Sequence, residues 1–233
     1  MSFLKRLFGG ERSEVPQPQP SPSRGPAACP YCGTIIDPPP AKSRKCPACG
    51  EPIVVRTRRT DRAKLLLTAT QGKEFDKQRK LEAQRNDGIR RSQNIGASIE
   101  DFERTEKELT EKWGFAPPRD VFWALAGKAA LTAFQNRDYH QLSMVYWQQA
   151  RLLYEEGKPH METAKEASKT YLQGYAERGF PLRVQVSAGC CPTCNRDEGR
   201  KFTIAEALEK LPIPHEACEN DGWCTCCWSP AVD

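Results

Sequence analysis

Cysteines occur near both ends of this 233-residue chain in the spacing of metal ligands, and none lies in the long stretch between. The N-terminal cluster reads Cys-Pro-Tyr-Cys-Gly at 29–33 and Cys-Pro-Ala-Cys-Gly at 46–50. The C-terminal cluster begins with Cys-Pro-Thr-Cys at 191–194 and continues with His215, Cys218, Cys224, Cys226 and Cys227. This distribution predicts two small modules, each held by a metal ion, on either side of a body that folds without one.

The N-terminal cluster has the ligand set of a structural zinc site. A Cys-Pro-x-Cys-Gly loop presents two sulfurs to one ion, and two such loops supply the four ligands of a tetrahedron. The ligands are Cys29, Cys32, Cys46 and Cys49. Four thiolates leave no coordination position for water, which argues against catalysis at this ion, and iron is the minor alternative to zinc. Residues 27–54 resemble a zinc ribbon, and this resemblance is compatible with nucleic-acid binding, protein binding or a purely structural role.

The C-terminal cluster offers more ligands than one zinc ion can use. Cys191 and Cys194 form its first pair, and the other candidates are His215, Cys218, Cys224 and Cys226. His215 and Cys218 have the spacing of a ligand loop and would complete a site of three cysteines and one histidine. Alternatively, Cys218 binds together with Cys224 or Cys226, and His215 only supports the ligands. A redox role for the Cys-Pro-Thr-Cys motif is disfavoured because no βαβ pattern surrounds it.

The C-terminal motif resembles a known family over residues 188–230. Its Cys-x2-Cys pair, the Glu-Gly turn at 198–199, the Pro-His-x2-Cys segment at 214–218 and the Cys-x-Cys at 224–226 are similar to the cysteine tail of phage Mu F-like head morphogenesis (minor head) proteins. The resemblance implies a metal-binding tail and a role in virion assembly. The chain departs from the family's pattern at Glu198, where Asp is usual, in the extra residues between Cys218 and Cys224, and in lacking the larger α/β domain.

Composition limits the compartment and the partners. No apolar run is long enough to span a bilayer and no secretory signal is recognisable, so we expect a cytoplasmic protein. In a reducing compartment, paired Cys-x2-Cys motifs favour zinc over disulfides. The formal net charge is +5, and basic residues outnumber acidic ones between Arg56 and Arg91. That segment makes nucleic acid or an anionic membrane a candidate partner.

The rest of the chain divides by composition and periodicity. Residues 1–8 place Phe3, Leu4, Leu7 and Phe8 on one helical face, a pattern that would allow contact with a membrane surface. Residues 11–28 are rich in Pro, Ser and Gln and predict an extended linker. Residues 29–55 form the first metal module. Residues 56–97 are basic and contain three glycines, which predicts a linker or a loose helix.

Helical periodicity is clear over residues 98–180, and we expect an antiparallel body there. Ser98 and Asp101 form a capping box, Asp120 and Asp138 are expected N-caps, and Gly179 is an expected C-cap. The apolar faces include Ile99, Phe102, Leu109 and Trp113 in the first helix, and Val121, Phe122, Leu125, Ala129 and Phe134 in the second. Residues 182–233 predict a small α/β module with strands near 182–186 and 201–203 and a helix capped by Thr203.

These observations predict a mainly α protein with a metal module at each end and two zinc ions. The favoured function is a zinc-stabilised, non-enzymatic adaptor of bacterial or phage type that binds a protein partner. The alternatives are nucleic-acid binding through Arg56–Arg91 and a phage head assembly factor. An enzyme would need an open metal position beside an acid such as Glu198 or Glu216, and the surplus of ligands argues against one.

Overall fold

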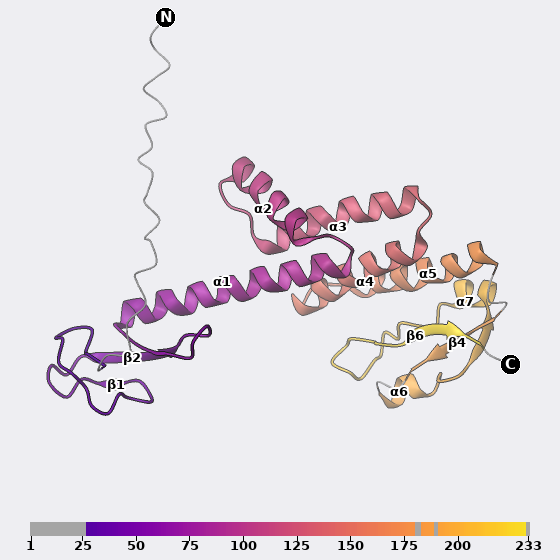
Figure 1. Cartoon of the computed structure of the whole chain (residues 1–233). Helices are drawn as coiled ribbons and strands as arrows, with labels where there is room; N and C mark the ends of the chain where they lie inside the picture. The colour runs from indigo at the N-terminus through magenta and orange to yellow at the C-terminus, as the bar shows by residue number, and fades with distance from the viewer. Residues whose placement is uncertain (1–26, 180–182, 189–190, 232–233) are drawn as a thin grey trace, which may run out of the picture. The chain divides into compact units, whose positions relative to one another are not determined.

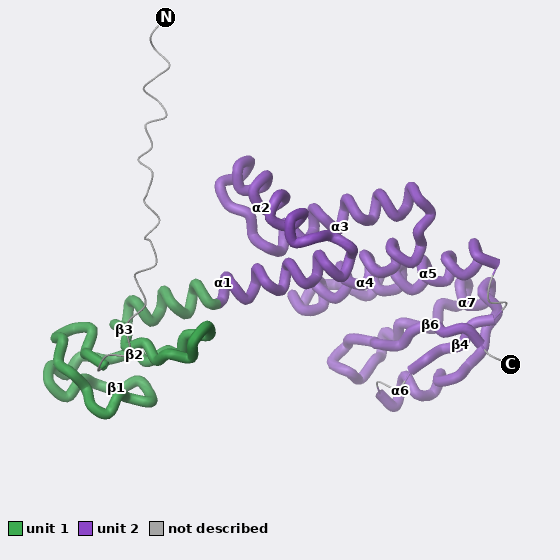
Figure 2. The backbone as a smooth tube through the Cα atoms, viewed as in Figure 1, with its two compact units in different colours: residues 1–79 green, residues 80–233 purple. Residues whose placement is uncertain are grey.

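The computed structural model describes residues 27–179, 183–188 and 191–231. It divides into two compact units, one ending at Arg79 and one beginning at Lys80 (Figure 2). The described residues contain seven helices and six strands, so the chain is mainly α with small sheets near its ends (Figure 1). The amphipathic segment expected at 1–8 and almost all of the linker expected at 11–28 lie outside the described residues.

The first unit is built on a three-stranded antiparallel sheet. Its strands are β1 (Arg44–Lys45), β2 (Pro52–Thr57) and β3 (Lys64–Leu67), in the order β1-β2-β3. Its core cluster consists of Cys29, Ile36, Cys46 and Ile53, with Leu66 packed against it. This core is small for a unit that folds by apolar burial alone.

The segment expected to be a linker or a loose helix is regularly structured. It holds β3 and the helix α1 (Ala69–Asn94), and α1 is continuous through two of the three glycines. Thr68 begins the helix with a reciprocal cap: its Oγ accepts from the Gln71 amide at 3.2 Å, and its own amide donates to Gln71 Oε1 at 3.0 Å. Thr68-Ala-Thr-Gln71 is therefore a capping box, a start signal that was present in the sequence.

The two glycines inside α1 allow close packing rather than interrupting the helix. A Cβ atom at Gly72 would lie 2.6 Å from Cγ1 of Val54, and one at Gly88 would lie 3.1 Å from Cβ of Pro118. A Cβ atom at Gly72 could fit only if Val54 shifted, and one at Gly88 would require its neighbours to move by a few tenths of an ångström. The third glycine, Gly96, has a φ of +83° just after the helix, where glycine is favoured.

Four helices follow as the expected body, namely α2 (Ile99–Trp113), α3 (Pro118–Gln135), α4 (Tyr139–Glu155) and α5 (Met161–Arg178). The capping box at Ser98, the cap at Asp138 and the left-handed Gly179 are confirmed. The cap expected at Asp120 is wrong: Pro117 is the N-cap, Pro118 takes the first helical position, where proline is favoured, and Asp120 lies in the first turn of the helix. Successive helices pack against each other and short loops reverse the chain between them (Figure 1).

The core of this body lies between α1, α2, α3 and α4. Its buried residues include Phe102, Val121, Phe122, Leu125 and Val145. Not all of the expected apolar face is inside, however. Ile99, Trp113 and Phe134 are 43%, 58% and 68% exposed. Periodicity predicts these residues on apolar helical faces, but no element within the described residues covers them fully.

The C-terminal module is a second three-stranded antiparallel sheet with two short helices. It contains β4 (Arg183–Ser187), α6 (Pro192–Asn195), β5 (Lys201–Thr203), α7 (Ile204–Lys210) and β6 (Cys227–Pro230), with strand order β5-β4-β6. The expected strands and the capping box at Thr203 are confirmed. Val184 and Val186 share a core with Leu172 of α5, so this module packs on the last helix of the body.

Candidate metal centres

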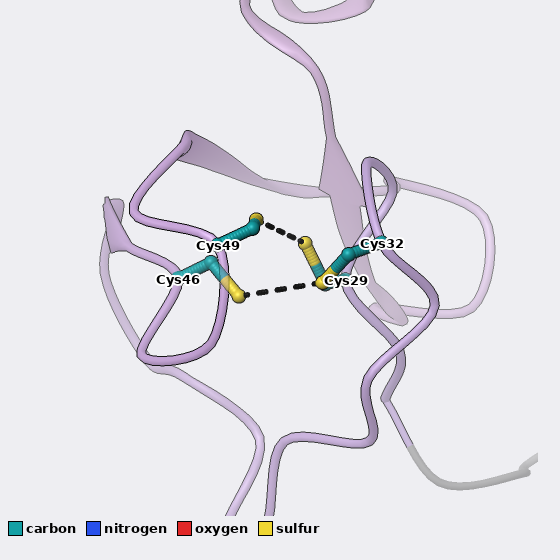
Figure 3. Close-up of side chains that lie close together, drawn as sticks. All are labelled: Cys29, Cys32, Cys46 and Cys49. Atoms are coloured by element: carbon teal, nitrogen blue, oxygen red, sulfur yellow. Dashed lines mark hydrogen bonds between the residues drawn. The ribbon is translucent and has the colours of Figure 1, made fainter.

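The four N-terminal cysteines converge on one point (Figure 3). The Sγ atoms of Cys29 and Cys49 are 3.8 Å apart, as are those of Cys32 and Cys46. All four sulfurs lie within 4.8 Å of one another. Sulfurs bound to zinc at about 2.3 Å in a tetrahedron are about 3.8 Å apart, so the group has the size of a four-thiolate metal site.

Two loops of matching backbone geometry create this arrangement. In each loop the first cysteine donates its amide to a carbonyl five residues later, from Cys29 to Thr34 at 2.9 Å and from Cys46 to Glu51 at 2.8 Å. The glycine that ends each motif, Gly33 or Gly50, has a φ near +75° and donates its amide back to the first cysteine. A left-handed residue is required at this turn, which explains the glycine after each Cys-Pro-x-Cys.

The electrostatics of this cluster favour a cation. Hydrogen bonds with the side chain and backbone of Thr34 lower the pKa of Cys32 to about 6. A backbone hydrogen bond from Cys49 is the main cause of a lowered pKa at Cys46. The Glu51 backbone would lower the pKa of Cys49 as well, but burial and the neighbouring sulfurs raise it to about 12. Thiolates already formed thus oppose further ionisation, and a divalent cation would remove that repulsion.

The C-terminal ligands form two overlapping groups. Cys194 belongs to both, together with His215, Cys224 and Cys226 in one and with Cys191 and Cys218 in the other. The structure therefore brings all six predicted ligands together. It does not group them as a site completed by His215 and Cys218 would require, because these two residues fall into different groups. The imidazole turns toward Cys224 and Cys226, with Nδ1 at 3.7 and 3.6 Å from their sulfurs.

His215 is oriented by a residue that the sequence analysis did not identify. Its Nε2 lies 2.8 Å from Oδ2 of Asp197, and Asp197 also pairs with Arg200. This contact leaves Nδ1 to face the sulfurs, in the way that carboxylates orient metal-binding histidines. The hydrogen bond from His215 lowers the pKa of Asp197, which keeps the carboxylate charged.

The extra residues between Cys218 and Cys224 dock the cluster onto the helical body. The Trp223 ring lies 5.5 Å from the Trp147 ring and 5.3 Å from the Tyr154 ring, both on α4. The Tyr154 hydroxyl donates to the carbonyl of Asp221 at 3.0 Å, and His160 Nε2 lies 3.2 Å from the carbonyl of Gly222. The residues between Cys218 and Cys224 thus form an anchoring loop, which we define as residues 219–223.

The two acids considered for a catalytic role make contacts within the module or to the body. Glu198 accepts a hydrogen bond from the backbone amide of Ala188, and Glu216 forms an ion pair with Lys165 of α5. The first contact joins two segments of the C-terminal module, and the second joins the module to α5. Neither acid belongs to the two ligand groups of the C-terminal cluster.

Comparison with known proteins gives no match: no protein-family model, no curated protein and no solved structure is significantly similar to this chain. Within the described part of the chain, no helix combines the length and apolar character needed to cross a membrane.

Proposed function

We propose that this protein is a zinc-stabilised, non-catalytic adaptor that binds a protein partner through an apolar groove between α2 and α3. Zinc is favoured by the ligands, because small tetrahedral sets of thiolates with an occasional imidazole are typical of structural zinc. A non-catalytic role is favoured by the N-terminal site, where four cysteines fill the tetrahedron. The observation that carries the adaptor proposal is the exposed aromatic surface of the helical body.

The groove is lined by Leu109 and Trp113 of α2 and by Trp123 and Ala124 of α3, with Arg119 and Asp120 completing its wall. Trp113 is 58% exposed, and the ammonium group of Lys112 lies 5.4 Å from the centre of its ring. Just beyond α2, Phe115 is 62% exposed. Large aromatic side chains exposed beside charged ones have the composition of a binding hot spot with a polar rim.

One polar atom beside the groove supports the same proposal. Nε1 of Trp123 is buried and has no hydrogen-bond partner among the described residues. A buried donor without an acceptor costs roughly 1–3 kcal/mol. A partner segment that inserts an apolar side chain into the groove would bury the exposed rings, and a turn of the Trp123 side chain would let its Nε1 donate to a carbonyl of that segment.

Site-specific photo-crosslinking tests this proposal in the native host. A photoreactive phenylalanine analogue at Phe115 is expected to capture a distinct protein, while the same analogue at Lys107, 78% exposed on α2, is not. Trp113→Asp should abolish capture, and Phe134→Asp, a matched change at the exposed far end of α3, should leave it intact. Capture that is unchanged by Trp113→Asp, or equal from Lys107, would reject the groove as the binding surface.

The C-terminal motif supports a narrower form of the same proposal, a phage head assembly factor. The spacing of Cys191, Cys194, His215 and the later cysteines supports it. In that form of the proposal, the crosslinked partner is a structural component of a virion.

A second candidate, nucleic-acid binding, is favoured by the distribution of charge. Residues 27–79 carry eleven basic and five acidic side chains, whereas residues 80–233 carry twenty and twenty-three. Some basic groups are neutralised internally, as in the ion pairs of Arg56 with Asp76 and of Arg58 with Asp61. Other basic side chains of the first unit are exposed and form no ion pair among the described residues, namely those of Arg59, Arg62, Lys64, Lys73 and Lys77.

Fluorescence anisotropy with random DNA and RNA tests this second candidate. Binding through these side chains should weaken as salt rises, with a slope that falls by about 1 for each lysine or arginine replaced. Lys73→Gln with Lys77→Gln should reduce the slope, and Lys107→Gln on α2 should not. Absence of binding at low salt would reject a nucleic-acid role for this unit.

A further inference from the structure

We infer that the C-terminal cluster binds two metal ions that share the thiolate of Cys194, so that the chain holds three ions in total. The inference rests on the proposed function in assuming that the cysteine clusters bind zinc. It goes further because it assigns every surplus ligand to an ion, whereas one ion per cluster leaves two ligands unused.

The distances fit two tetrahedra with a common corner. In the first group, the sulfur of Cys194 lies 3.8 Å from that of Cys224, and Nδ1 of His215 lies 3.6 Å from Cys226. In the second group, the sulfur of Cys218 lies 3.7 Å from that of Cys194 and 3.9 Å from that of Cys191. Tetrahedral zinc spaces two sulfurs by about 3.8 Å and a sulfur and a nitrogen by about 3.6 Å.

A single zinc ion would leave two of the six converging ligands unbound. Zinc takes four ligands in structural sites, and six converge here. A thiolate sulfur has further lone pairs and can bind two ions at once, whereas imidazole Nδ1 has one lone pair. Cys194 is the residue common to both groups, and it is fully buried between them. The ion bound by Cys191, Cys194 and Cys218 takes one further ligand to complete its tetrahedron.

Charge is a second, independent argument. All five cysteines of the two groups are buried, with exposed fractions between 0% and 8%. Five thiolates carry a charge of −5, so that one Zn²⁺ leaves −3 in the interior and a second reduces this to −1. Because uncompensated buried charge is costly, the second ion makes it possible for all five cysteines to bind as thiolates.

The shared sulfur also joins different parts of the module. The three-thiolate group links α6, through Cys191 and Cys194, to Cys218 at the start of the anchoring loop. The four-ligand group links Cys194 to Cys224 and Cys226, which lead into β6. The amide of Cys194 lies 3.4 Å from the sulfur of Cys191, which fixes the first pair on one helical turn. Two ions that share the Cys194 sulfur thus fix Cys218 and Cys224, the residues on either side of the anchoring loop.

Native mass spectrometry of the full chain, purified with zinc under reducing conditions, tests the inference. We expect three ions in the unmodified protein and two after Cys191→Ser, since that change leaves its group with only two protein ligands. Cys227→Ser is the matched control, because Cys227 is exposed and belongs to neither group, and it should retain three. Two ions in the unmodified protein, with no loss from Cys191→Ser, would overturn the inference.

Cobalt substitution tests the bridge itself and does not depend on any variant of the C-terminal cluster folding. In a Cys46→Ser background, which disables the N-terminal site, the electron paramagnetic resonance signal of Co²⁺ should rise with the first equivalent and fall with the second. The fall is expected because a bridging thiolate couples the two spins. A signal that keeps rising through the second equivalent would show separate ions and reject the bridge. The ion count needs no partner, so it stands apart from the crosslinking result.

Discussion

At the scale of single residues, the C-terminal cluster depends on a contact behind its ligands. Asp197 holds the far nitrogen of His215 and thereby points Nδ1 at Cys224 and Cys226. The cysteines could be found from their spacing, but Asp197 could not, because the fold alone brings it to His215 across 18 positions of sequence.

Replacing Asp197 is expected to weaken metal binding while leaving every ligand in place. Asp197→Ala should lower the zinc affinity of the C-terminal cluster by about 10–100-fold, the usual effect of removing a carboxylate that orients a metal-binding histidine. Competition with a chromophoric chelator, in a Cys46→Ser background, measures this affinity. Glu209→Gln, an exposed acid on α7, is the control. Equal affinity for both variants would show that Asp197 does not support the site.

At the scale of elements, the effect of a glycine inside a helix depends on how closely a neighbouring element approaches it. Gly72 allows α1 to approach β2 at Val54, whereas Gly127, in the middle of α3, faces open space. The two positions read alike in the sequence, since each is a glycine inside a helical pattern. Their environments predict effects of opposite sign.

Alanine at these two positions should therefore change stability in opposite directions. Gly72→Ala should destabilise the first unit by about 1–3 kcal/mol, because its Cβ would meet Cγ1 of Val54 at 2.6 Å. Gly127→Ala should stabilise the second unit by about 0.5–1 kcal/mol through its helix propensity. Hydrogen exchange of β2 and α1 measures the first effect. Tryptophan fluorescence in urea measures the second, because all five tryptophans lie after residue 80.

A double substitution provides the control for the first effect. Val54→Ala removes the methyl groups that the new Cβ would meet, so it should cost less stability in the Gly72→Ala background than alone. Stabilisation by Gly72→Ala, comparable to that of Gly127→Ala, would contradict the packing of α1 on β2.

Sequence patterns predicted the elements better than their packing. The caps at Ser98, Asp138, Gly179 and Thr203 and the strand around Val184 follow from local chemistry, and all are confirmed. The sequence predicts α1 only as a loose helix, with a linker as the alternative, because glycines weaken a helical pattern; the capping box at Thr68 is the local signal that marks its start. The exposure of Trp113 and Phe134 could not be predicted either, since periodicity shows an apolar face but not whether another element covers it.

At the scale of the whole molecule, two kinds of core stabilise different parts of the chain. The core around Phe102 and Phe122 is apolar and needs no ligand. The core of the first unit contains Cys29 and Cys46, and that of the C-terminal module contains five cysteines beside Val184, Val186 and Leu172. Protonated and without metal, those cysteines would lose the contacts that close the modules. We therefore expect folding to depend on metal in the two cysteine modules and not in α2–α4.

Hydrogen exchange of the reduced protein, with and without a strong zinc chelator, tests this claim most directly. We predict that chelation removes amide protection from residues 29–57 and 191–230, because folding of these modules would be coupled to metal binding. Protection should persist in α2, α3 and α4, and α5 should lose part of its protection because Leu172 belongs to the metal-dependent core. Loss of protection throughout α2–α4, or full protection of both cysteine modules after metal removal, would contradict it.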